Sequence, residues 1–140
     1  MSSWSQIEAE RAFAGVTRAR RRAALAGRLR RRGRAVCGLA VYDERRQAGA
    51  AGGRGLREIP VDAISGTTEP NRAAQFDRHF RPTRLTRCRW QSVWLAMHRG
   101  TTLPPISVVQ VGDEFAIRDG HHRVSVAKAL GAPTISAIVV

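Results

Sequence analysis

Residues 119–123 read Asp-Gly-His-His-Arg, which combines a turn residue with three side chains that can donate hydrogen bonds. Gly120 permits a sharp backbone turn and leaves room for a ligand to approach the main chain. A helix that begins directly after it has unpaired N–H groups and the positive end of a dipole, and both attract anions. The pattern indicates a phosphate site, in which His121, His122 and Arg123 add side-chain donors to the backbone N–H groups that follow Gly120.

The residue types at this helix start are a second indication of an anion. The helix dipole favours Asp or Glu in the first turn by about 0.3–1 kcal/mol each. Cationic donors there are unfavourable unless a bound anion offsets them. The alternative is that Asp119 caps the helix and the two histidines are merely solvated. Adjacent helix positions point about 100° apart, so His121 and His122 are not expected to share a metal ion.

The elements expected around this motif are a hairpin, a helix and a strand. Residues 106–111 and 114–118 are rich in β-branched and apolar types and are separated by Gly-Asp, which predicts a β-hairpin. Residues 121–130 predict a short helix that ends at Gly131. Residues 134–140 form a nearly continuous apolar run, which predicts a buried strand.

Further elements complete an α+β domain, a small mixed sheet with flanking helices. Trp90, Val93, Trp94 and Met97 recur at three- and four-residue spacing and predict one face of an amphipathic helix over residues 86–99. That spacing favours core packing over a base-stacking surface. Residues 58–64 predict a strand, and residues 65–70 predict a turn after it.

The N-terminal part of the chain is strongly basic. Residues 1–34 contain ten arginines against Glu8 and Glu10 and predict a basic helix outside the main core. Residues 47–55 are rich in glycine and alanine and predict a linker. We therefore expect an arm over residues 1–55 and a domain over residues 56–140. The arginines of the arm that are candidates for nucleic-acid contact are Arg18, Arg20, Arg21, Arg22, Arg28, Arg30, Arg31 and Arg32. The arm could equally bind an acidic protein or act as a solubilising segment.

The overall charge favours an anionic partner. The chain of 140 residues has 24 Lys and Arg against 11 Asp and Glu, for a formal net charge of +13. An arginine-rich composition is also typical of GC-rich genomes, which is the alternative explanation. No apolar run is long enough for a membrane span or a secretory signal, so we expect a cytoplasmic protein without membrane association. Cys37 and Cys88 lack the spacing of a metal site.

The motif resembles a known superfamily. Gly120-His121-His122-Arg123, followed by Ala127 and Leu130-Gly131, is similar to the second conserved box of ParB-type proteins and to the phosphate loop of sulfiredoxin. Residues 59–64 resemble the first ParB box. The form Asp-Gly-His-His-Arg also resembles ParB-like proteins of high-GC bacteria and free serine kinases of the same fold. The resemblance covers about 80 residues.

The resemblance implies a ParB/sulfiredoxin fold and a nucleotide ligand, a nucleoside triphosphate or diphosphate with Mg²⁺. It implies a ParB-like nucleotide-binding module, related to chromosome-partitioning proteins and associated with DNA through the basic arm. His121 stands where sulfiredoxin has its reactive cysteine, which argues against that activity. His121-His122 replaces the Glu-Arg of partition proteins, which puts CTP chemistry in doubt.

Two other functions fit the same motif. The serine-kinase resemblance implies a small phosphotransferase or nucleotide hydrolase, with Asp119 and Glu69 as candidates for a general base or a metal ligand. Glu69 could instead be a plain turn residue before Pro70. A non-catalytic module that binds a partner protein is the third possibility. Separately, Arg72, Arg78 and Arg81 could line the anion site or form a solvated basic face.

Overall fold

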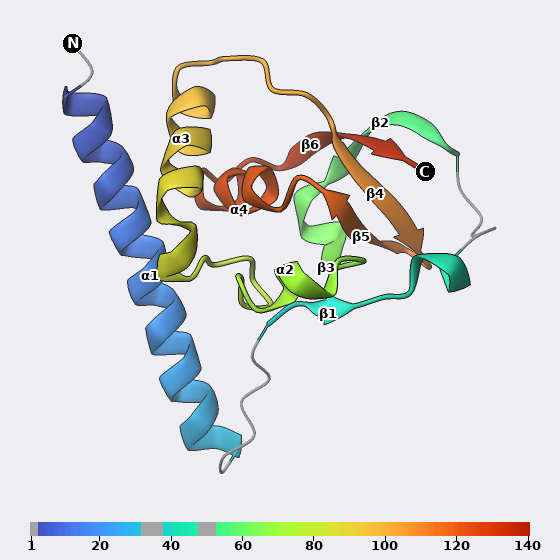
Figure 1. Cartoon of the computed structure of the whole chain (residues 1–140), viewed down its shortest axis with the longest axis horizontal. Coiled ribbons are helices and arrows are strands. Elements are labelled where there is room, and N and C mark those ends of the chain that lie inside the picture. Colours follow the sequence, from blue (N-terminus) through green and yellow to red (C-terminus); the bar gives the residue numbers. More distant parts are fainter. Residues whose placement is uncertain (1–2, 32–37, 48–52) are drawn as a thin grey trace.

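A six-stranded mixed sheet lies at the centre of the protein, and three helices stack on one side of it (Figure 1). The structure is a computed structural model that describes residues 3–31, 38–47 and 53–140. The helices are α1 (Ser3–Arg31), α2 (Pro70–Ala73), α3 (Arg87–His98) and α4 (His121–Ala129), with 3₁₀ turns η1 (Glu44–Gln47), η2 (Val61–Ala63) and η3 (Arg84–Thr86). The strands are β1 (Ala40–Val41), β2 (Gly55–Pro60), β3 (Ile64–Thr67), β4 (Ile106–Val111), β5 (Glu114–Asp119) and β6 (Thr134–Val139).

The strand order is β1-β3-β5-β4-β6-β2. Parallel pairs are β1–β3, β3–β5 and β4–β6, and antiparallel pairs are β4–β5 and β2–β6. The expected α+β fold with a mixed sheet and flanking helices is therefore confirmed. Because β3 and β5 run parallel and side by side, their carboxyl ends meet at one edge, where α4 begins.

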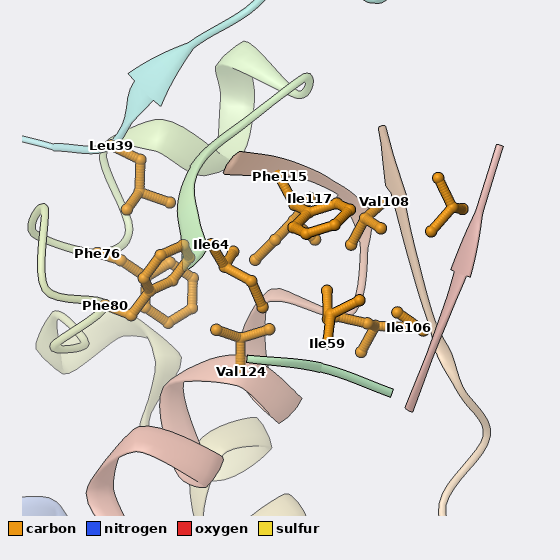
Figure 2. Close-up of a cluster of buried hydrophobic side chains, with 12 residues drawn as sticks. Leu39, Ile59, Ile64, Phe76, Phe80, Ile106, Val108, Phe115, Ile117 and Val124 are labelled. Atoms are coloured by element: carbon orange, nitrogen blue, oxygen red, sulfur yellow. The ribbon is translucent and has the colours of Figure 1, made fainter. Parts of the chain in front are cut away.

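Helix α4 is buried on two sides, which explains its apolar composition. Val124 joins the cluster of sheet residues that includes Ile59, Ile64 and Ile117 (Figure 2). Val126 faces the other way and packs with Trp90 of α3. The layers therefore run from the sheet to α4, then α3, then α1, and α4 is fixed from both faces.

Most of the expected elements are confirmed. The helix predicted over residues 86–99, the hairpin, the short helix after Gly120 and the final strand all form within one or two residues of their predicted ends. Strand β6 is less buried than predicted, since Ile138 is 42% exposed on the face of the sheet opposite Ala137. That face is only partly covered within the described residues.

The segment between residues 58 and 70 differs from the prediction. The predicted single strand is divided into β2 and β3 by the turn η2, and residues 64–67, which include part of the predicted turn, form β3. Gly66 explains the error, because a Cβ there would collide with the carbonyl oxygen of Ala40 in β1. The glycine allows close approach of two backbones inside the sheet rather than a turn.

The prediction that the N-terminal helix lies outside the core was wrong for its first half. Ala9 and Phe13 are 1% and 6% exposed and pack with Trp90 and Trp94 of α3. The rings of Phe13 and Trp90 are 5.6 Å apart. The domain boundary after residue 55 stays a prediction, although α1 and β1 both contact the later part of the chain. No helix in the described ranges is long and apolar enough to cross a membrane.

A pair of substitutions in α1 tests its packing. Phe13→Ala removes a buried ring from the α1–α3 interface and should lower the free energy of unfolding by about 3 kcal/mol. Leu25→Ala on the same helix removes a side chain that is 61% exposed and should change it by about 0.5 kcal/mol or less. Urea denaturation measures both values. Equal losses for the two variants would show that α1 does not pack on α3.

Candidate anion-binding site

A polar cleft lies at the start of α4, beside the carboxyl ends of β3 and β5. Its volume is about 190 Å³. The residues that line it are Glu69, Arg72, Arg89, Val93, Arg118, Asp119, Gly120, His121, His122 and Arg123. The whole motif of residues 119–123 is therefore at the cleft, and residues from α2, α3 and the β3–α2 connection complete it.

Gly120 makes the turn from β5 into α4, with a φ angle of 114°. This is a backbone conformation that residues with a Cβ rarely adopt. A Cβ at this position would also collide with the side chain of Ile106 in β4. The space beside the glycine is therefore filled by the core, and not left open for a ligand as the sequence indicated. Its role is to let α4 start directly against the sheet.

His121 is a buried link between α4 and β3. Its side chain is 5% exposed, and its Nε2 atom lies 2.6 Å from Oγ1 of Thr67, which is fully buried. The same oxygen accepts a hydrogen bond from the backbone N–H of Glu69 at 2.9 Å. Thr67 thus fixes both His121 and Glu69. It was not predicted, because its segment was interpreted as a turn.

His122 is also buried but has no hydrogen-bond partner for its side chain within the described residues. It is 8% exposed and lines the cleft, with the Phe76 ring against it at a centroid distance of 5.3 Å. Its ring nitrogens are nevertheless not among the fully enclosed atoms that lack a partner, so they are still accessible from the cleft. An acceptor atom in the cleft would give the imidazole that partner.

Both histidines are neutral at pH 7. Burial, then the positive charge of Arg72 and the repulsion that a protonated His122 would exert, lower the pKa of His121 from 6.5 to about 4. Burial, Arg72 and Arg89 lower the pKa of His122 to about 4 as well. The alternative of solvated histidines is wrong, because the imidazoles are buried beside arginines. They can donate hydrogen bonds to an anion but do not carry positive charge.

Arg123 braces the loop before β4. Its Nη1 atom donates to the backbone oxygens of Pro104 at 2.5 Å and Pro105 at 3.1 Å. Its Nη2 atom lies 3.2 Å from Oδ2 of Asp119. Most of the guanidinium's donors are therefore already used, and Arg123 closes the cleft wall more than it reaches into the cleft.

The positive charge of the cleft comes mainly from other arginines. Arg72 of α2 and Arg89 of α3 are exposed, and neither is within ion-pair distance of a carboxylate in the described part of the chain. The side chain of Arg72 donates to Oε1 of Gln75 at 3.2 Å. Arg118 of β5 lies 3.4 Å from Oε1 of Glu44. Arg72 was predicted from the sequence, whereas Arg89 and Arg118 were missed, because their meeting depends on how α3 packs on α4.

The other predicted site residues are divided between the cleft and the rest of the surface. Glu69 and Asp119, fifty residues apart in sequence, both line the cleft. Arg78 and Arg81 do not line it, and Arg81 instead lies 3.5 Å from Asp77. No cluster of three or more His, Cys, Asp or Glu side chains that could hold a metal ion occurs in residues 3–31, 38–47 and 53–140.

The arginines of the basic helix have different environments. Exposed positions on α1 are Arg18, Arg21, Arg22 and Arg28. Arg20 is partly buried, and its Nε atom is enclosed without a partner in the described structure. Arg32 and the side chains of Arg30 and Arg31 lie outside the described residues.

The lowered histidine pKa values predict a loss of stability in mild acid. In the unfolded chain both histidines take up a proton near pH 6.5, whereas in the folded protein they do so only near pH 4. The stability that depends on neutral histidines is therefore complete above pH 6.5 and falls as the pH drops towards 4. Between pH 7 and 5.5 we expect a loss of about 2 kcal/mol in the free energy of unfolding, measured by urea denaturation.

Two variants provide the controls for this measurement. His122→Asn should remove about half of the pH dependence, because one of the two buried titrating groups is gone. His79→Gln, which changes an exposed histidine, should leave the pH dependence as it is. An unfolding free energy that stays constant from pH 7 to 5.5 in the wild type would contradict the burial of the pair.

No protein-family model matches the chain, and no curated protein matches it. Among solved structures, a sulfiredoxin from Arabidopsis thaliana is similar to it, with 20% sequence identity and a TM-score of 0.43. The match covers 61% of this chain and 83% of that chain.

Proposed function

We propose that the cleft at the start of α4 binds a phosphate-bearing ligand, with a nucleoside triphosphate or diphosphate and Mg²⁺ as the first candidate. The observation that carries the proposal is the meeting of Arg72, Arg89 and Arg118, from three separate elements, around the N-terminus of α4. Guanidinium groups match the geometry of phosphate oxygens and keep their charge at any physiological pH. The helix N-terminus adds N–H groups aimed at the same place.

His122 supports the proposal independently of the arginines. A neutral imidazole that is buried at the cleft and lacks a partner can donate its N–H to a phosphate oxygen. The bond would replace the solvent that the ring nitrogens now reach in the cleft. Residues 119–123 also resemble the phosphate loops of ParB-type proteins, which agrees with the same ligand class.

The size of the cleft limits what it can enclose. Sites that bury a complete drug-sized ligand have volumes of about 300–1,000 Å³. A cleft of about 190 Å³ is suited to phosphoryl groups. The nucleoside part of a nucleotide would therefore lie mostly outside it, and we expect weak discrimination between bases.

Ligand-induced stabilisation tests this function. Thermal unfolding is measured with inorganic phosphate, pyrophosphate and the common nucleoside di- and triphosphates, each with Mg²⁺. A ligand at 100 times its dissociation constant should stabilise the fold by about 2.7 kcal/mol. Arg89→Gln should lose most of this response, because it removes a cation of the cleft that has no carboxylate partner in the described structure.

Arg84→Gln is the matched control, since Arg84 is exposed and does not line the cleft. It should keep the full response. Arg123→Ala is a poor test, because Arg123 also holds the backbone of Pro104 and Pro105. A wild-type protein that gives no shift with any of these phosphates, or equal losses in the Arg84 and Arg89 variants, would rule out the proposed site.

A phosphotransferase or nucleotide hydrolase is the second candidate, and the position of two carboxylates favours it. Glu69 and Asp119 line the same cleft as the arginines, and the Asp119 side chain is 80% exposed. A carboxylate at this place could take a proton from an attacking hydroxyl or water, or hold Mg²⁺ against the phosphates.

Turnover separates the enzyme from a binding module. Asp119→Asn should abolish phosphate release or transfer while the ligand-induced thermal shift remains. Asp113→Asn, an exposed change in the β4–β5 turn, should leave both properties unaltered. Phosphate release that continues unchanged in the Asp119 variant would exclude that carboxylate as the base.

A further inference from the structure

Helix α1 continues well beyond the part that packs on the domain. Its buried positions are Ala9, Phe13 and Thr17, which recur every four residues along one face. No residue from Arg18 to Leu29 is buried. The second half of the helix accordingly extends past α3 into solvent (Figure 1). Core packing therefore does not account for the residues of this half.

The solvent side of α1 carries a stripe of arginines. On an α-helix, residues separated by three, four or seven positions lie on one face. Arg11, Arg18 and Arg22 have this spacing and lie opposite Ala9 and Phe13. All three side chains are exposed. Arg21 and Arg28, which are seven residues apart, form a second exposed row about 60–80° round the helix from Arg18. We define the arginine stripe as both rows together, Arg11, Arg18, Arg21, Arg22 and Arg28.

Arg20, in contrast, lies towards the domain side of the helix. It is partly buried, and its Nε atom is enclosed. The structure therefore separates the arginines of this helix into those that face solvent and one that does not. The sequence, which groups them all in one basic run, does not make this distinction.

No carboxylate neutralises the stripe within the described residues. Glu8 lies 3.1 Å from Nε2 of His98, and no ion pair joins a stripe arginine to an acidic side chain. Arg18 and Arg22 are four residues apart, and like charges at this spacing destabilise a helix. An anionic partner would remove this repulsion, so the unneutralised row of charge points to an intermolecular role.

We propose that the arginine stripe binds the backbone of double-stranded DNA. From Arg11 to Arg28 the stripe is roughly 26 Å long, at about 1.5 Å per residue. Duplex DNA offers one negative charge per about 1.7 Å of its axis, and its major groove admits an α-helix. Charge complementarity over this length favours a regular polyanion over a single acidic side chain.

Two other polyanionic partners fit the stripe less well. Proteins that bind single strands stack the bases on aromatic side chains, and no aromatic residue occurs between Phe13 and the end of α1. Helices that bind membrane surfaces separate an apolar face from a basic face. Here Leu25 and Leu29 lie on the same side as Arg18 and Arg22, so no apolar face is set apart.

This proposal is independent of the phosphate cleft, because none of the stripe residues line it. The test uses the full chain and a labelled duplex of random sequence, with binding measured by fluorescence anisotropy over a series of NaCl concentrations. The triple variant Arg18→Gln, Arg22→Gln and Arg28→Gln keeps a similar helix propensity. Its affinity for the duplex at roughly 100 mM NaCl should decrease by about tenfold or more, since three phosphate contacts are lost.

The salt dependence provides a sharper measurement. In a plot of the logarithm of the binding constant against that of the salt concentration, each phosphate contact contributes about 0.9 to the slope. The slope of the triple variant should therefore be shallower by about 2.7. The matched control, Arg78→Gln with Arg84→Gln and Arg99→Gln, removes the same charge from exposed positions outside α1 and should keep the wild-type slope.

Specific results would overturn the proposal. Equal losses in the two triple variants would attribute binding to net charge alone. Tighter binding to single-stranded RNA, or to vesicles that contain anionic lipids, than to the duplex would assign the stripe to a different partner. Arg89→Gln should leave DNA binding unchanged, so failure of the cleft proposal and failure of this one give different results.

Discussion

The hydrogen bond between Thr67 and His121 is the constraint on which the candidate site depends. It joins the end of β3 to the first residue of α4 at 2.6 Å, inside the core. The same threonine oxygen accepts the N–H of Glu69, so the chain that leaves the sheet is fixed at the same place. With Gly120 packed against Ile106, the N-terminus of α4 has one position relative to β3 and β5. The cleft is thus largely formed before any ligand binds, which reduces the entropy lost on binding.

Local sequence patterns predict the helices and strands of this fold better than they predict which of these elements pack together. The hairpin, α3 and α4 follow from periodicity and from turn residues, because those signals are local. Strand β3 was missed because Gly66 has the composition of a turn, and only the approach of Ala40 from a distant segment explains it. The packing of α1 was missed because Phe13 and its buried neighbours occupy half of a helix whose other half is exposed and rich in arginine. Periodicity summed over the whole helix hides a face that ends midway.

The candidate site shows the same division between local and tertiary information. Residues 119–123 could be located from a strand, a glycine and a helix start. The charge state of the two histidines could not be predicted from the sequence. Their lowered pKa values come mainly from burial and from arginines on other elements. Of the three donors that follow Gly120, Arg123 alone is charged, and it is paired with Asp119. Arg72, Arg89 and Arg118 supply further positive charge, and Arg89 reaches the cleft through the packing of α3 on α4.

This arrangement would link anion binding in the cleft to the protonation of His122. Burial contributes most to the low histidine pKa values, and Arg72 contributes next. An anion placed beside Arg72 and Arg89 would oppose the second contribution and stabilise a protonated His122, so its pKa would rise in the bound state. Linkage then requires that the anion bind more tightly as the pH falls, over the range between the free and bound pKa values. The folded state becomes less stable over much of this range. An anion in the cleft would therefore stabilise the protein most under the acidic conditions in which the unliganded fold is weakest.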